Sequence, residues 1–385
     1  MSTFTKPSQL LIIVLIILLS TSQVFAADVS VPYLQLVTRG TQSEGFSTNG
    51  KIEFLFEGGI KVGGGIRLGL DGTNLSQVIP NTEIFDSAIT SSDTKVVGLN
   101  FLSANLVFRD LVGPGINLEY FVGQTTSMAS GDIFSDKFGS FPVTTNYRGF
   151  SAFDKAPYFN GIHKIHGTGM HLEFESPTES TLSLFAYQEA RLLNSQGNSI
   201  PRKYSADIRF LANSDTAKLE IFAGGTFPQG PLGIYRGGLL LYAGGGPIGL
   251  FIQAGIPKWD PRGPLPTMSN LYILIEPRIS LVTIQFIPTF FWRPSSYLLQ
   301  STNTTQAFDA NVLLGLGDIH KDIFSIGIEG NLKYNESTND QLKIKAIPFI
   351  NFRTPGAIWQ LKTSVEVYPT YLNAPELVIG VEAKF

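Results

Sequence analysis

The segment Leu377–Phe385, Leu-Val-Ile-Gly-Val-Glu-Ala-Lys-Phe, ends the chain and carries its clearest structural pattern. Apolar residues recur at every second position, and the intervening positions from Gly380 onward are small or charged. The apolar set is Leu377, Ile379, Val381, Ala383 and Phe385. Successive side chains of a β-strand point to opposite faces, so this period predicts a strand with one apolar and one polar face.

The same period of two recurs along the whole chain in segments of about ten residues, which is typical of membrane-spanning β-barrels. For example, Ala206, Ile208 and Phe210 alternate with Asp207 and Arg209. We expect eighteen strands, with sixteen nearly as well supported. The expected ranges are 31–39, 51–58, 60–70, 96–109, 115–124, 165–176, 180–190, 203–213, 216–226, 232–243, 247–257, 268–277, 280–292, 306–316, 322–334, 341–353, 356–367 and 376–385.

The connections between these strands alternate between short and long. Gly58-Gly59 and Ser176–Glu179 are short, whereas Asp71–Lys95 and Gln124–Lys164 are long. Barrels of bacterial outer membranes have short turns on the inner side and longer loops on the outer side. Pro288 and Pro348 lie inside expected strands, where each removes a ladder hydrogen bond, so they predict bulges or shifted boundaries.

The composition excludes several classes of protein. Charged residues make up only 15% of the chain, well below the fraction usual in soluble globular proteins, and glycine accounts for 39 of 385 residues. Cysteine is absent. The net charge of −3 does not indicate nucleic-acid binding. The number of strands is too large for one soluble sandwich. We therefore expect an all-β fold, a transmembrane antiparallel up-and-down β-barrel of about 16–18 strands, in which all backbone groups are paired.

The first 26 residues have the pattern of a secretory signal peptide. Lys6 precedes the apolar run Leu10–Leu19, and Val24-Phe25-Ala26 is typical of a cleavage site after Ala26. The apolar run is too short for a spanning helix. We expect residues 27–385 to form a single barrel domain, exported to the outer membrane of a diderm bacterium.

In this plan the mature chain resembles porin-type outer-membrane barrels. The terminal strand ending in Phe385 resembles the signal by which the barrel-assembly machinery recognises such proteins. The resemblance implies a channel for passive diffusion of small hydrophilic solutes, surrounded by outer-membrane lipid, with a homo-oligomer as a further expectation. In general porins, the loop corresponding to 124–164 folds into the pore and narrows it.

The polar faces of the expected strands supply candidates for the pore lining. Charges of both signs in a water-filled lumen tune its selectivity; alternatively, these groups pair with one another and fill a closed lumen. The candidates are Glu53, Arg67, Arg109, Glu119, Glu173, Asp207, Arg209, Glu329, Lys333, Lys343, Lys345, Lys362 and Glu366.

The loop 124–164 is rich in aromatic residues and supplies candidates for a constriction. The alternative is a surface loop that folds on itself or packs against another copy of the chain. The candidates are Phe138, Phe141, Tyr147, Arg148, Phe150 and Tyr158.

Other functions find less support. His163, His166 and His171 are close in sequence, but on a strand His166 and His171 point to opposite faces, so we expect no metal site. No Gly-x-Ser-x-Gly motif is present, and we expect neither a cofactor nor enzymatic activity. A transporter of hydrophobic compounds and a structural or adhesive surface barrel remain as alternatives.

Overall fold

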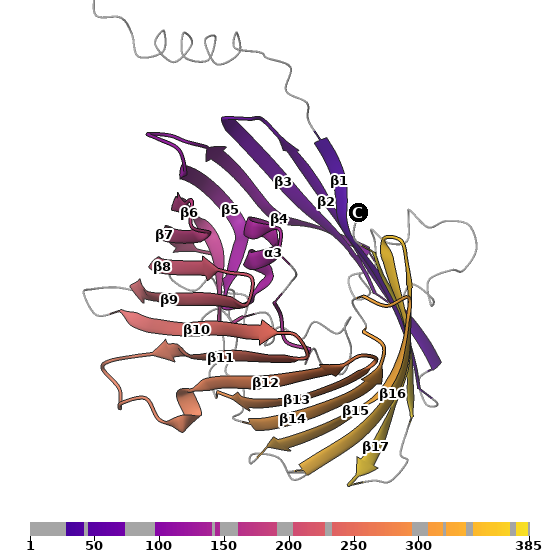
Figure 1. Ribbon diagram of the computed structural model, residues 1–385. Coiled ribbons are helices and arrows are strands. Elements are labelled where there is room, and N and C mark those ends of the chain that lie inside the picture. The colour runs from indigo at the N-terminus through magenta and orange to yellow at the C-terminus, as the bar shows by residue number, and fades with distance from the viewer. Residues whose placement is uncertain are drawn as a thin grey trace, which may run out of the picture.

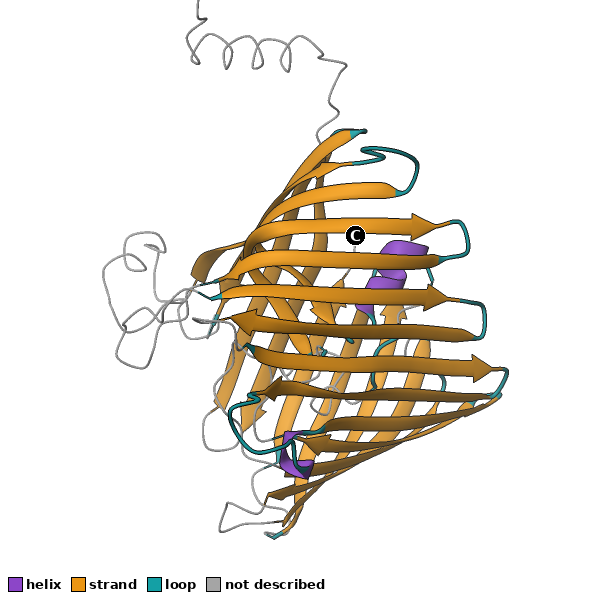
Figure 2. Cartoon of the chain, turned by 90° about the vertical axis from the view of Figure 1, so that its left-hand side faces the viewer, coloured by secondary structure: helices purple, strands orange, loops and turns teal. Residues whose placement is uncertain are grey.

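A computed structural model describes residues 28–41, 45–73, 97–140, 143–146, 161–190, 203–227, 233–294, 307–318, 321–335, 342–369 and 375–383 of the chain. The described residues form one antiparallel sheet of eighteen strands in which each strand pairs with its sequence neighbours and β1 pairs with β18 (Figures 1 and 2). The sheet is therefore closed into a barrel. This confirms the expected all-β up-and-down barrel and sets the strand number at eighteen.

The strands follow the predicted segments one for one. Their bounds are β1 (Asp28–Thr41), β2 (Gly45–Gly58), β3 (Val62–Gly72), β4 (Val97–Phe108), β5 (Ile116–Met128), β6 (His163–Ser176), β7 (Ser180–Glu189), β8 (Tyr204–Asn213), β9 (Ala217–Phe227), β10 (Ile234–Gly245), β11 (Ile248–Trp259), β12 (Tyr272–Leu281), β13 (Ile284–Arg293), β14 (Ala307–Leu316), β15 (Phe324–Asn335), β16 (Leu342–Thr354), β17 (Ala357–Tyr368) and β18 (Glu376–Ala383). Two short helices, α3 (Asp132–Phe138) and η2 (Met268–Asn270), accompany them. No helix in the described ranges is long and apolar enough to cross a membrane.

Alternation gives each strand two chemically distinct faces. On the outside, Ile66, Ile208 and Ile379 are 47%, 44% and 47% exposed. Their neighbours Arg67 and Asp207 lie on the inner face, which also carries the buried charged and polar residues of β6–β17. The outer wall is thus a broad apolar surface, as lipid contact requires, and the polar groups are collected inside.

Three local predictions are wrong. The turn between β12 and β13 is at Val282–Thr283, not at 277–279. The connection between β1 and β2 is confined to residues 42–44, shorter than the expected loop of residues 40–50. The alternation Leu102, Ala104, Leu106 and Phe108 predicts one shared face, but a bulge at Leu102 in β4 breaks it, so Leu102 does not share the outer face of Ala104.

The two strand prolines do not mark bulges. Pro288 and Pro348 lie within β13 and β16, and no register shift occurs at either one. The register of the flanking pairs sets Pro288 opposite Pro277 of β12. Two residues without an N–H therefore share one gap in the ladder, in which residues 276–278 of β12 and 287–289 of β13 are not paired with each other.

Candidate pore and its inner segment

After β5, the chain turns back into the barrel instead of leaving it. The described residues 129–140 and 143–146, here called the inner segment, lie within the ring of strands, and α3 is visible inside the barrel in both views (Figures 1 and 2). Gly131 precedes α3 with a φ of 80°, and a Cβ at this position would collide with the Val143 carbonyl oxygen. Only glycine fits such a turn without strain.

One face of the inner segment is apolar and packs against the barrel wall. Phe134 and Val143 are fully buried, together with Met128 at the end of β5, in a cluster with Leu240, Phe251, Tyr272, Leu274 and Phe291 of β10–β13. Burial of one such side chain stabilises the packed state by roughly 1.5–3 kcal/mol. The cluster therefore fixes the inner segment to one side of the lumen.

The opposite face of α3 is polar. Phe134 and Phe138 are four residues apart, with ring centroids separated by 6.2 Å, and they form the apolar stripe. Asp132 and Asp136 have the same spacing and are exposed toward the lumen. Residues at i and i+4 share one face of a helix, so this seven-residue helix presents two carboxylates to the interior space.

Hydrogen bonds to buried carboxylates hold the ends of the inner segment. Glu276 of β12 accepts the hydroxyl of Thr145 at 2.6 Å and the backbone N–H of Asn146 at 2.9 Å. Glu220 of β9 accepts the N–H of Ala129 at 2.8 Å, and the side-chain amide of Gln253 donates to the Ala129 carbonyl. These contacts satisfy backbone groups that would otherwise be buried without partners.

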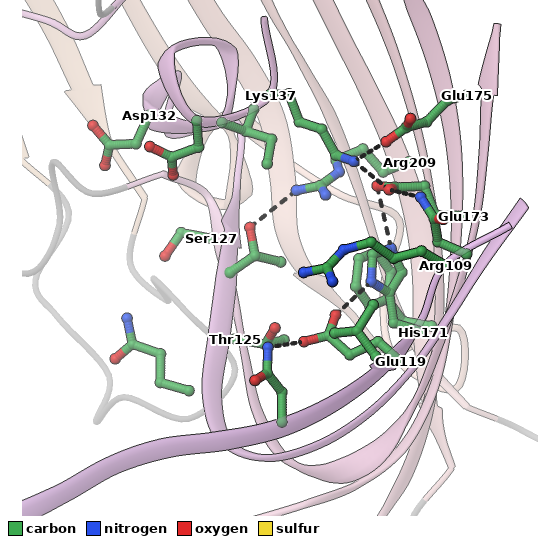
Figure 3. A pocket seen from close by; sticks show the side chains of 18 of the residues that line it. Arg109, Glu119, Thr125, Ser127, Asp132, Lys137, His171, Glu173, Glu175 and Arg209 are labelled. Atoms are coloured by element: carbon green, nitrogen blue, oxygen red, sulfur yellow. Dashed lines mark hydrogen bonds and ion pairs between the residues drawn. The ribbon is translucent and has the colours of Figure 1, made fainter. Parts of the chain in front are cut away.

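Lys137 anchors the C-terminal end of α3 to the barrel wall. Its ammonium group pairs with both Glu173 and Glu175 of β6, as Figure 3 shows. Glu173 is only 4% exposed. These ion pairs fix the C-terminal end of α3 to β6, close to the short turn between β6 and β7.

A second buried network braces the wall behind the inner segment. Arg236 of β10 donates from Nε to Asp207 of β8 at 2.7 Å, and both side chains are inaccessible to solvent. The Tyr187 hydroxyl donates to Asp207 at 3.0 Å and lies 3.0 Å from His163 Nε2. The intervening Gly224 has no side chain, because a Cβ there would overlap the Asp207 carboxylate.

Two adjoining cavities remain beside the inner segment. The smaller, about 650 Å³, lies between α3 and the wall formed by β4–β8, and the larger, about 1230 Å³, follows the inner face of β2–β5 (Figure 3 shows the first). They share six lining residues and therefore adjoin each other. The shared residues are Asn105, Val107, Arg109, Glu119, Gln124 and Thr125.

Polar contacts organise the wall of the smaller cavity. Glu119 accepts a hydrogen bond from Asn105 at 2.8 Å and lies 2.9 Å from His171 Nδ1. The His171 ring stacks on the Phe185 ring, with centroids 4.2 Å apart. The guanidinium of Arg209 lies 5.3 Å from the centre of the Phe185 ring. These contacts hold the polar side chains of the wall in fixed positions.

The strand register places twelve of the thirteen predicted lining residues on the inner face, and Arg109, which follows β4, borders both cavities. Arg67, Arg109 and Glu119 border the larger cavity, whereas Glu173 and Arg209 border only the smaller. Asp207 is buried in the network with Arg236 and does not reach the open space; Glu329 and Lys362 are also buried. Their role as a pore lining stays a prediction.

The other inward residues lie in pairs around the lumen. Glu53 pairs with Lys51 at 2.7 Å. Lys333 lies opposite Lys343 across β15 and β16, and Lys345 lies opposite Glu366 across β16 and β17. Both signs of charge therefore occur on the inner wall.

Of the predicted constriction residues, only Phe138 can be placed. It belongs to α3, is half-buried, and packs against the apolar cluster. Phe141, Tyr147, Arg148, Phe150 and Tyr158 lie outside the described residues, as do Ala26 and Phe385. Sequence reasoning missed Asp132 and Asp136; the signal that would have found them is their helical spacing between two glycines, Gly131 and Gly139.

Comparisons with known proteins find only distant resemblances among the solved structures that follow. No family model matches the chain, and no curated protein matches it. A porin of Rhodopseudomonas blastica, solved as a triple mutant, is 9% identical with a TM-score of 0.48, over 93% of this chain and all of that one. The OmpF of Salmonella typhi, solved in complex with daunomycin, is 8% identical with a TM-score of 0.44, over 93% of this chain and 97% of that one.

The strand pairing itself defines the class. A closed barrel of eighteen antiparallel strands, with an apolar exterior, a polar interior and an inner segment folded into the lumen after β5, has the architecture of a porin-type barrel.

Proposed function

We propose that the protein is an outer-membrane channel through which small hydrophilic solutes diffuse passively. The observation that carries this proposal is the pair of adjoining cavities beside the inner segment, bordered by Arg67, Arg109, Glu119 and Glu173. Barrels of sixteen to eighteen strands usually leave an aqueous channel. Among the described residues, the inner segment occupies the side of the lumen next to β10–β13, and the larger cavity follows the side of β2–β5.

The outer wall supports the proposed location. Apolar side chains such as Phe56, Ile208 and Phe352 are exposed there, and water would disfavour so large an apolar surface. We infer that lipid of the outer membrane covers it. Export by the segment 1–26, with cleavage after Ala26, and recognition of Phe385 by the barrel-assembly machinery belong to the same proposal, as does assembly into a homo-oligomer.

Liposome swelling tests the channel directly. Vesicles containing the purified protein are expected to swell in isotonic sugars, rapidly with a pentose and progressively more slowly with di- and trisaccharides, because the inner segment narrows the lumen. Protein-free vesicles and vesicles containing heat-denatured protein serve as controls. If none of the sugars causes swelling, the proposal is overturned and a closed structural barrel is favoured.

A further inference from the structure

We propose that His171 and Glu173, on the lumen side of β6, together bind a divalent transition-metal ion such as Zn²⁺. The sequence alone predicts no metal site, because His166 and His171 point to opposite faces of the strand. The structure supplies a different second ligand, since Glu173 lies two residues beyond His171 on the same face. Three features support the site: the orientation of the His171 ring, two buried atoms without hydrogen-bond partners, and the spacing of those atoms.

A carboxylate and an aromatic ring fix the orientation of the imidazole. Glu119, directly opposite on β5, lies 2.9 Å from His171 Nδ1, and its other oxygen accepts from Asn105 at 2.8 Å. The imidazole also stacks on the Phe185 ring. Because an ionised carboxylate only accepts, Nδ1 carries the proton, and Nε2 of the neutral ring keeps its lone pair. A carboxylate behind Nδ1 is the usual outer-shell partner of a metal-binding histidine.

Two buried atoms of the site have no hydrogen-bond partner. They are His171 Nε2 and Glu173 Oε2, which belong to residues that are 8% and 4% exposed and that both border the smaller cavity. Lys137 pairs with the other oxygen of Glu173, Oε1. A buried acceptor without a donor is costly, and one cation bound by both atoms would remove this cost at each of them.

The spacing of these two atoms fits a single metal ion. His171 Nε2 and Glu173 Oε2 are 3.8 Å apart, as Figure 3 shows for their side chains, which is too far for a hydrogen bond. A Zn–N bond of about 2.0–2.1 Å and a Zn–O bond of about 2.0–2.2 Å together span roughly 4.2 Å. One ion can therefore bond to both atoms without movement of the strand.

The number and kind of ligands define the ion that fits. Within the described ranges, no group of three His, Cys, Asp or Glu side chains could hold a metal ion. The site therefore has two protein ligands, and water from the adjoining cavity completes the coordination shell. An imidazole nitrogen suits Zn²⁺, Ni²⁺ or Cu²⁺, whereas Mg²⁺ and Ca²⁺ prefer oxygen ligands alone. Such an open site predicts reversible binding.

Calorimetric titration of the purified protein in detergent with Zn²⁺ tests the site. The unmodified protein should bind one Zn²⁺ ion more per chain than either His171→Gln or Glu173→Gln. The matched control, His166→Gln, removes a half-buried histidine of the same strand that borders neither cavity, and it should bind Zn²⁺ like the unmodified protein. Mobility on unheated gels shows that each variant is folded.

Two further titrations examine the imidazole and its orientation. In the unmodified protein, which requires no variant to fold, an excess of Mg²⁺ should not displace the Zn²⁺ ion, because Mg²⁺ gains little from a nitrogen ligand. The variant Glu119→Gln should weaken Zn²⁺ binding by about tenfold or more, because it removes the charge behind Nδ1. Unchanged affinity in this variant would contradict the positioning role of Glu119.

The outcomes separate the metal site from the proposed function. Equal Zn²⁺ stoichiometry in the unmodified protein and His171→Gln, equal loss of binding in His166→Gln, or displacement of Zn²⁺ by Mg²⁺ overturns the site. These titrations need no solute flow, so their failure leaves the proposed channel intact. Conversely, vesicles that do not swell in any sugar overturn the channel and leave the metal site standing.

Discussion

Replacement of residues 130–160 by a linker of about four Gly and Ser residues is expected to raise single-channel conductance at least about twofold. The inner segment occupies the side of the lumen next to β10–β13, where Phe134 and Val143 are buried with Phe251. Its removal turns this filled volume into solvent. A linker of this length can join the two ends because they already lie close together: the N–H of Ile162 donates to the Met128 carbonyl at 2.8 Å.

A matched loop replacement controls for general damage to the barrel. The connection of residues 260–267, between β11 and η2, lies at the rim and not inside the ring of strands (Figure 2). Its replacement by the same linker should leave conductance unchanged. If deletion of the inner segment also leaves conductance unchanged, the segment does not restrict the path of ions, and the assignment of the narrow region is wrong.

Substitution of Asp207 by alanine is expected to lower the free energy of unfolding by about 3–5 kcal/mol. The Asp207 carboxylate and the Arg236 guanidinium are both inaccessible to solvent, and the variant leaves the guanidinium buried without its counter-charge. It also removes the acceptor of the Tyr187 hydroxyl. Urea titration of the protein in lipid vesicles, followed by the mobility of the folded form on unheated gels, measures the change.

Two further variants separate the buried charge from other effects. Asp215→Ala removes an exposed carboxylate in the turn between β8 and β9, and its effect should stay within about 0.5 kcal/mol. The double variant Asp207→Leu with Arg236→Met removes both charges, and most of the lost stability should return. Equal stability of the Asp207 and Asp215 variants would show that the buried pair does not brace the wall.

The strand pattern of the fold was predictable from sequence because alternation is a local property. Alternate residues of a strand point to opposite faces, so the inner position of Glu173 or Lys362 follows from its place in the alternating pattern alone. The prediction fails where the backbone departs from regular geometry. The bulge at Leu102 reverses the parity of β4, and the turn at Val282–Thr283 contains neither Gly nor Pro to mark it.

The site was less predictable because its contacts join distant parts of the chain. Nothing near Thr145 in the sequence indicates that its hydroxyl meets Glu276, 131 residues away. Tyr242 and Tyr272 lie near strand ends, which favours a place at the membrane interface; instead, both pack inside the barrel around the inner segment. Only the register and the inward fold of the chain after β5 bring these groups together.

The central claim is that alternate side chains face lipid and water, and cysteine labelling tests it on adjacent residues. The chain contains no cysteine, so Arg67→Cys and Ile66→Cys each introduce a single thiol on β3, on opposite faces of the wall. In proteoliposomes, a membrane-impermeant maleimide small enough to enter the lumen should label the cysteine at position 67 and leave the one at position 66 unmodified. Equal labelling at both positions, or labelling at position 66 alone, would contradict the account.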